Sequence, residues 1–125
     1  MPTPFGTIIL EHFRRPRNRG SLQAPDVSQE GFNALCGDRV RMELTVHEDT
    51  VSEARFTADA CAISIASASL LTERVRGLSL TAAEGIAPEE VLASLGAEIP
   101  AARRACALLP LTTLQNGIRA FREQR

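Results

Sequence analysis

Hydrophobic and polar residues alternate along the middle of the chain, beginning near residue 39. The apolar positions of the first alternating run are Val40, Met42, Leu44 and Val46. A period of two is typical of a strand with one face buried. After a polar turn at residues 47–50, a second run places Ala54, Phe56 and Ala58 on one face. The pattern predicts two neighbouring strands joined by a tight turn.

A third strand is indicated just before these two. Phe32 and Leu35 are its apolar positions, whereas residues 21–29 have the composition of a loop. Consecutive strands joined by short turns pair antiparallel. The sequence therefore predicts a small antiparallel sheet of three strands.

Helical patterns precede and follow the predicted strands. Residues 7–15 predict a short helix that places Ile8, Ile9, His12 and Phe13 near one face. Pro16 ends it, and residues 16–20 read as a turn. Residues 62–76 are rich in small and aliphatic side chains and are followed by Gly77, which predicts a helix that stops there.

The last third of the chain predicts two more helices. One covers residues 87–95. The other carries Leu111, Leu114, Ile118 and Phe121 at spacings of three and four. Proline disrupts a helix interior, so Pro110 predicts that this helix starts no earlier than about Cys106. Strands followed by helices define an α+β domain, with the sheet packed against several helices. At 125 residues the chain has the length of one domain, residues 1–125.

Composition and charge exclude several classes of protein. The net charge is −1 and only 4% of residues are aromatic, which excludes an electrostatic or base-stacking nucleic-acid binder. All 14 basic residues are arginine, so Schiff-base and P-loop lysine chemistry are excluded. No apolar run approaches the ~20 residues of a membrane span. The start has an acidic residue and no basic region before its apolar stretch, so we expect no export signal and a cytoplasmic protein.

Three cysteines, Cys36, Cys61 and Cys106, each fall at a boundary between predicted elements. An odd number without an export signal favours metal binding or thiol chemistry over disulfides. Their gaps match no zinc-finger or ferredoxin pattern, and a free cysteine is often only a small buried hydrophobic residue. A position at a helix start, with Arg103 and Arg104 beside Cys106, predicts a lowered thiol pKa.

The tripeptide Cys36-Gly37-Asp38 places a thiol and a carboxylate on either side of a glycine. With Cys61 and Cys106, these groups supply three sulfur ligands and one oxygen ligand, a tetrahedral set for zinc or iron. Asp38 has a simpler alternative role, capping a local turn.

Three other polar residues carry groups that can bind a metal. Asp59, close to Cys61 in the sequence, is a spare carboxylate that could substitute for Asp38. His12 on the first helix and His47 in the polar turn are better explained by packing and by solvation.

These motifs, in this order, resemble the U-type iron–sulfur scaffold family, which includes IscU, SufU and the NifU N-terminal domain. The resemblance is carried by Glu11-His12-Phe13, Pro16-Arg17-Asn18-Arg19-Gly20, Cys36-Gly37-Asp38, Ala54-Arg55-Phe56, Cys61-Ala62-Ile63-Ser64-Ile65-Ala66-Ser67-Ala68-Ser69 and Cys106. It implies a three-stranded sheet with a metal site at one end of the molecule. The ligands it implies are Cys36, Asp38, Cys61 and Cys106, holding a transient [2Fe–2S] cluster or iron, with zinc as the alternative occupant.

The same resemblance implies a function and partners. A cysteine desulfurase would deliver sulfur as a persulfide to Cys36, Cys61 or Cys106, and the finished cluster would pass to acceptor proteins. The protein would then be a non-enzymatic scaffold, working as a monomer or weak homodimer. The alternative is a SufU-like, zinc-dependent sulfurtransferase that activates the desulfurase. A regulator of a desulfurase and a structural zinc module are further alternatives.

Some positions depart from the family pattern. Ala105 stands where IscU-type members have histidine, and Ala60 stands where glycine is usual. The chaperone-recognition segment of the IscU branch is altered to Ile99-Pro100-Ala101-Ala102-Arg103, so a dedicated chaperone is not expected. Ala105 and the residues after Cys61 are SufU-like, whereas the gap of 45 residues before Cys106 is IscU-like.

Overall fold

A computed structural model describes residues 6–124 of the chain. Its elements follow the order expected of an α+β domain, with the strands before most of the helices. They are α1 (Gly6–Arg14), β1 (Val27–Asn33), β2 (Asp38–His47), β3 (Thr50–Asp59), α2 (Ala62–Val75), α3 (Leu80–Glu84), α4 (Pro88–Ser94), a short 3-10 turn (Ala101–Arg103) and α5 (Arg104–Glu123).

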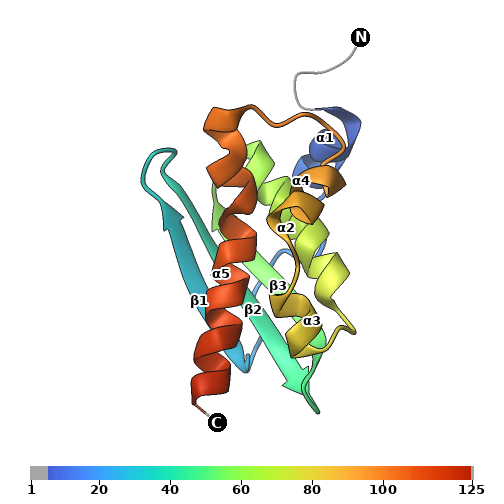
Figure 1. Cartoon of the computed structure of the whole chain (residues 1–125), viewed down its shortest axis with the longest axis vertical. Coiled ribbons are helices and arrows are strands. Elements are labelled where there is room, and N and C mark those ends of the chain that lie inside the picture. The colour runs from blue at the N-terminus through green and yellow to red at the C-terminus, as the bar shows by residue number, and fades with distance from the viewer. Residues whose placement is uncertain (1–5, 125) are drawn as a thin grey trace.

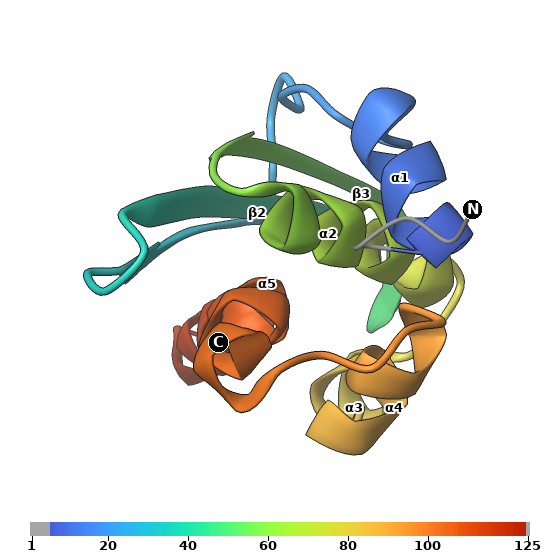
Figure 2. The ribbon, with the colours of Figure 1, turned by 90° about the horizontal axis from the view of Figure 1, so that it is seen from above.

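The three strands form one antiparallel sheet in the order β1-β2-β3. α5 runs along β1 and β2, and α2 packs between α5 and β3, so these two helices cover one face of the sheet (Figures 1 and 2). α1 packs on the far side of α2. This arrangement confirms the predicted fold, and it brings the starts of β2, α2 and α5 to the same end of the molecule.

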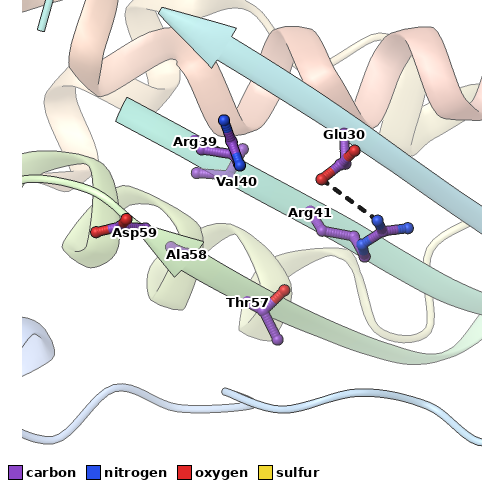
Figure 3. A pocket seen from close by; sticks show the side chains of 7 residues that line it. All are labelled: Glu30, Arg39, Val40, Arg41, Thr57, Ala58 and Asp59. Carbon is purple, nitrogen blue, oxygen red and sulfur yellow. Dashed lines mark ion pairs between the residues drawn. The ribbon is translucent and has the colours of Figure 1, made fainter. Parts of the chain in front are cut away.

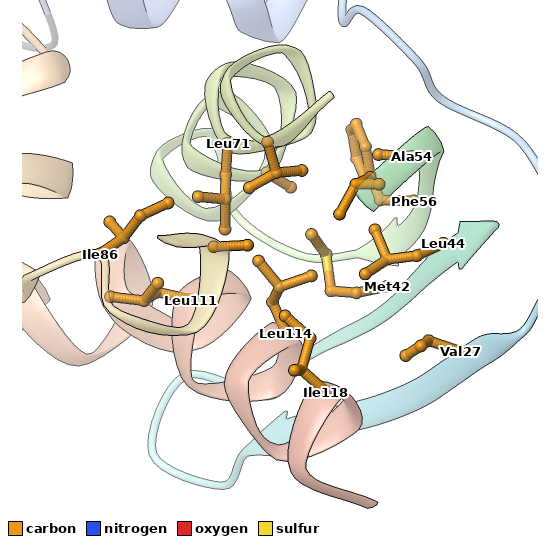
Figure 4. Close-up of a cluster of buried hydrophobic side chains, with 14 of the residues drawn as sticks. Val27, Met42, Leu44, Ala54, Phe56, Leu71, Ile86, Leu111, Leu114 and Ile118 are labelled. Carbon is orange, nitrogen blue, oxygen red and sulfur yellow. The ribbon is translucent and has the colours of Figure 1, made fainter. Parts of the chain in front are cut away.

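The main core lies between the sheet and the two long helices (Figure 4). The alternation along β2 and β3 directs Met42, Leu44 and Phe56 inward, where all three are fully buried. α5 contributes Leu114 and Ile118 from its apolar stripe. Burial of side chains of this size stabilises the fold by roughly 1.5–3 kcal/mol each relative to exposure.

The turn that follows α1 closes the free edge of β3. Phe56 exchanges two backbone hydrogen bonds with it, since its N–H donates to the Asn18 carbonyl (3.0 Å) and its carbonyl accepts from Gly20 N–H (2.8 Å). Asn18 also donates through Nδ2 to the Thr72 hydroxyl of α2 (3.2 Å). This explains the proline- and asparagine-containing turn structurally, because a covered strand edge cannot pair with another chain.

Two predictions for the N-terminal half are wrong in detail. β1 begins at Val27, inside the stretch predicted as a loop, and Leu35 lies in the turn after the strand, 95% exposed. Buried or half-buried positions alternate with exposed ones along β1, but most of its residues are polar, on both faces, so the sequence shows no hydrophobic alternation. In α1 the buried residues are Ile9 and His12, while Ile8 and Phe13 are 40% and 41% exposed.

The start of α5 also differs from the prediction. The helix begins at Arg104, so Pro110 lies inside it. Proline has no N–H, which leaves the carbonyl of Cys106, four residues earlier, without its helical donor. The Ser64 hydroxyl of α2 donates to that carbonyl instead (2.8 Å), and the neighbouring Ala107 carbonyl accepts from Ser67 (2.6 Å). These two serines satisfy carbonyls around the proline, a compensation that periodicity does not reveal.

Short α3 was not predicted; Ser79 caps it by accepting a hydrogen bond from Ala82 N–H. Within residues 6–124, no helix has both the length and the apolar character needed to cross a bilayer.

Candidate metal centre

Cys36 lies in the hairpin loop between β1 and β2. Asn33 pairs with Asp38 at the last rung of the ladder, which leaves four residues in the loop. Gly37 adopts φ +70°, a left-handed conformation that suits glycine and closes the loop in front of β2. Cys36 is thereby held at the surface as an exposed residue.

Asp38, the first residue of β2, is 2% exposed and joins the strand to the start of α2. Its Oδ1 accepts a hydrogen bond from Cys61 N–H (2.9 Å), and its Oδ2 accepts one from the Ser64 hydroxyl (2.8 Å). Cys61 is the N-cap residue of α2, and its own side chain makes no capping hydrogen bond. The carboxylate therefore caps a helix distant in sequence, at the end where negative charge is favoured.

Cys106 enters from α5, as the third residue of that helix, and is fully buried. Its Sγ lies 2.7 Å from Sγ of Cys36, so the two thiols are in direct contact. Asn33 Nδ2 points at the Cys106 sulfur from β1 (3.8 Å). The packing of α5 on β1 thus brings together two cysteines that are 70 residues apart.

The predicted ligands converge at one end of the molecule. Ligand atoms of Cys36, Asp38 and Cys106 all lie within 4.8 Å of one another. Cys61 is outside that mutually close group, but its Sγ lies 3.5 Å from Asp38 Oδ2. Three sulfur atoms and one carboxylate are the donor types that zinc and iron take in tetrahedral sites, so the donor set fits either metal.

Two opposing effects act on the pKa of Asp38. Burial by itself raises the pKa of this carboxyl group. The hydrogen bonds from Cys61 N–H and the Ser64 hydroxyl outweigh burial and hold the pKa below its ordinary value. Asp38 is therefore a carboxylate at neutral pH, the form that binds a metal ion.

The prediction of a lowered pKa for Cys106 is wrong. Burial raises the pKa of this thiol, and its hydrogen bond to Cys36 and the nearby Asp38 carboxylate raise it further. Arg103 and Arg104 are exposed, so solvent screens their charges from the buried sulfur. Without a metal, Cys106 is a protonated thiol.

Other candidates from the sequence lie outside the group. His12 is buried in α1, where its Nδ1 is hydrogen-bonded to the Ser69 hydroxyl (2.7 Å). His47, predicted to lie in a turn, is the last residue of β2 and is exposed. Asp59 lies opposite Arg39 in the register of β2 and β3. It lines a hollow of about 210 Å³ formed by residues of all three strands (Figure 3). That hollow holds the Arg41–Glu30 ion pair (3.3 Å) and contains none of the cysteines.

Sequence reasoning did not identify Asn33 and Ser64 as parts of the site. Asn33 contacts the Cys106 sulfur and also accepts a hydrogen bond from Leu35 N–H (3.1 Å), which shapes the loop that carries Cys36. Ser64 contacts Asp38 and the Cys106 backbone. The available signal was their proximity to cysteines in sequence, three residues in each case. Only the fold shows which groups they reach.

Comparison with known proteins agrees with this geometry. The model of the NifU-like N terminal domain family matches residues 5–125, so the chain belongs to that family. A NifU-like protein (N-terminal) from Brucella abortus has a similar solved structure, with a TM-score of 0.79 and 25% identity over 97% of this chain and 96% of that one. The fold and the sequence resemblance are confirmed together.

Curated relatives come from three branches of the family. The chain is 37% identical to the Bifunctional protein NifU/MnmA of Rubrobacter xylanophilus over 98% of its length, and 31% identical to the iron-sulfur cluster assembly scaffold protein IscU of Azotobacter vinelandii over 97%. It is 34% identical to the zinc-dependent sulfurtransferase SufU of Bacillus subtilis over 66%. The chain spans 25%, 96% and 56% of these relatives' lengths, respectively.

Proposed function

We propose that this chain, as a single domain, is an iron–sulfur cluster assembly scaffold. In this role it accepts sulfur from a cysteine desulfurase, binds iron, holds a [2Fe–2S] cluster and passes it to acceptor proteins. The observation that carries the proposal is the convergence of Cys36, Asp38 and Cys106 from distant segments, with Cys61 beside Asp38. The relatives named as scaffold proteins support it.

Sulfur acceptance is assigned to Cys36. Cys36 is an exposed residue of the hairpin loop, whereas Cys106 is buried and Cys61 is only partly exposed. The Cys36 thiolate attacks the outer sulfur of the desulfurase persulfide; a new S–S bond forms on Cys36 and the desulfurase cysteine leaves as a thiolate. This transfer needs no redox partner. Conversion of each transferred sulfur to sulfide takes two electrons from a reductant outside this chain.

The remaining residues would hold the cargo. Cys36, Cys61 and Cys106 would supply sulfur ligands to iron, and Asp38 would supply an oxygen ligand. An oxygen ligand suits transfer, because a carboxylate holds iron less tightly than a fourth thiolate does. Bound iron and sulfide are the substrates of this process, and the chain contributes the ligands, their orientation and the protection given by burial.

A zinc-dependent sulfurtransferase is the second candidate. It is favoured by the SufU relative and by the same donor set, Cys36, Asp38 and Cys106 with Cys61 beside Asp38, which zinc accepts. In that case one zinc ion would occupy the site, and Cys36 would pass sulfur onward without cluster assembly. Both candidates use the same four residues and the same desulfurase.

Anaerobic reconstitution tests the proposal. The protein is incubated with ferrous iron, cysteine and a desulfurase, with and without equimolar zinc, and iron, zinc and sulfide are assayed after desalting. A scaffold is expected to retain iron and sulfide in near-equal amounts and to transfer them to an apo-ferredoxin. Zinc retained without sulfide, with faster desulfurase turnover, would replace the scaffold by the sulfurtransferase. Retention of neither metal would reject both.

A further inference from the structure

Ser64 occupies the junction of all the elements that carry the candidate ligands. It lies one turn into α2, three residues after Cys61, and is 0% exposed. Its Oγ is 2.8 Å from Asp38 Oδ2 on β2 and 2.8 Å from the Cys106 carbonyl oxygen on α5. Cys61 Sγ lies 3.8 Å from the same Ser64 Oγ atom. One buried hydroxyl therefore contacts three residues of the site.

The second acceptor of Ser64 exists because of Pro110. In an uninterrupted helix the Cys106 carbonyl would accept the N–H of residue 110, and proline has none. A buried carbonyl without a donor is destabilising. Ser64 supplies the missing donor, so this one hydroxyl connects the backbone of Cys106 with the carboxylate of Asp38.

A hydroxyl has a single hydrogen, and both of its neighbours here are acceptors. It therefore donates fully to the carboxylate or to the carbonyl at one time, or shares the hydrogen between them. A donated or shared hydrogen holds Asp38 Oδ2 beside α2 (2.8 Å), and a carboxylate oxygen of Asp38 lies within 4.8 Å of the sulfurs of Cys36 and Cys106. Hydrogen bonds of this kind to a ligating carboxylate commonly fix its orientation in metal sites.

We propose that Ser64 is a positioning residue for the metal centre: its hydroxyl orients Asp38 toward the cysteine sulfurs, and the carbonyl freed by Pro110 fixes the place of that hydroxyl between β2 and α5. The inference rests on the proposed function only in that the four residues hold a metal ion. Ser64 itself is not a ligand.

Ser67 provides a matched control. It lies one turn further along α2, is also buried, and donates to the adjacent α5 carbonyl, that of Ala107 (2.6 Å). Its hydroxyl has no hydrogen bond to Asp38 among the bonds of the described residues. Ser64→Ala and Ser67→Ala therefore each remove one hydroxyl bond between α2 and α5, whereas only Ser64→Ala also removes the support of Asp38 and leaves the Cys106 carbonyl without a donor, which Pro110→Ala restores.

The experiment measures zinc affinity by competition with a chromophoric chelator. Loss of an outer hydrogen bond to a metal ligand typically lowers affinity about 10–100-fold, which is the loss expected for Ser64→Ala. Ser67→Ala is expected to leave the affinity unchanged. Combined with Asp38→Ala, Ser64→Ala is expected to cost nothing further, since its effect passes through the carboxylate.

Pro110→Ala keeps the test informative should Ser64→Ala alone fail to fold. Alanine at 110 returns an N–H to the Cys106 carbonyl, so the folding cost of Ser64→Ala falls while its effect through Asp38 remains. In that background the affinity loss is still expected. Absorption of the cobalt(II)-loaded protein gives a second readout, because a displaced carboxylate alters the ligand-field bands whereas a purely structural loss does not.

The outcomes separate this inference from the proposed function. Equal affinity losses in Ser64→Ala and Ser67→Ala, a loss that persists in the Asp38→Ala background, or unchanged affinity in Ser64→Ala would overturn the positioning role. Failure of the unmodified protein to bind zinc, cobalt or iron would instead reject the metal centre itself.

Discussion

Replacing Cys36 by serine is expected to abolish sulfur transfer from a cysteine desulfurase to this protein. The exposed position of Cys36 in the hairpin loop makes its thiol accessible to another protein's persulfide, and serine cannot form the S–S bond. With metal-free protein and one equivalent of persulfidated desulfurase, we expect the sulfur on the peptide that contains Cys36, located by alkylation and mass spectrometry. The rise in desulfurase turnover is expected to disappear in the same variant.

Cys106→Ser is the matched control for that experiment. Cys106 is fully buried, and burial raises the pKa of its thiol, so it is a poor acceptor in the metal-free protein. The Cys106→Ser protein should therefore still take sulfur on Cys36 in a single turnover. Sulfur found first on Cys106, or stimulation that survives the loss of all three thiols, would contradict the assignment.

Replacing Gly31 by alanine is expected to destabilise the fold by about 3 kcal/mol, the upper range for overpacking a core. Gly31 lies on β1 directly against α5, and an added Cβ would overlap the Thr113 hydroxyl, 3.0 Å from Thr113 Cβ and 3.3 Å from Leu109 Cδ1. β1 and α5 would have to separate. Because these elements carry the Cys36 loop and Cys106, metal affinity should fall with the stability measured by urea unfolding.

Thr113→Ala supplies the control for Gly31→Ala. Within residues 6–124 the Thr113 Oγ1 atom is buried without a hydrogen-bond partner, so its removal alone should change stability little. In the Thr113→Ala background, Gly31→Ala should lower the free energy of unfolding by at most half as much, since the worst overlap is gone. Strict additivity of the two changes in unfolding free energy would show that the contact between Gly31 and Thr113 does not cause the destabilisation by Gly31→Ala.

The strongly patterned parts of the fold were predictable from the sequence. Alternation along Val40–Val46 and the spacing of Leu111, Leu114 and Ile118 fixed β2 and the body of α5, because one face of each is buried in the same core. β1 was partly missed since its inward positions include Gly31, which leaves room for α5 instead of filling the core. The hydrophobic periodicity of a segment does not indicate such a close approach of β1 to α5.

The candidate site shows the same division. Cys36, Asp38 and Cys106 were identified from residue type and family resemblance, and the structure brings their ligand atoms together. The pKa direction of Cys106 was not predictable, because burial of a single atom depends on tertiary packing. Ser64 was missed for a related reason: its importance arises from Pro110, 46 residues away, through a carbonyl that only the folded chain brings near.

X-ray absorption at the zinc edge tests the central claim most directly, namely that Cys36, Asp38, Cys61 and Cys106 together bind one metal ion. Protein loaded with one equivalent of zinc is expected to show three sulfur ligands at ~2.3 Å and one oxygen ligand at ~2.0 Å. Asp38→Ala should replace the protein oxygen by water and lower the affinity. A site with four sulfur ligands, or with two sulfur ligands or fewer, would contradict the account.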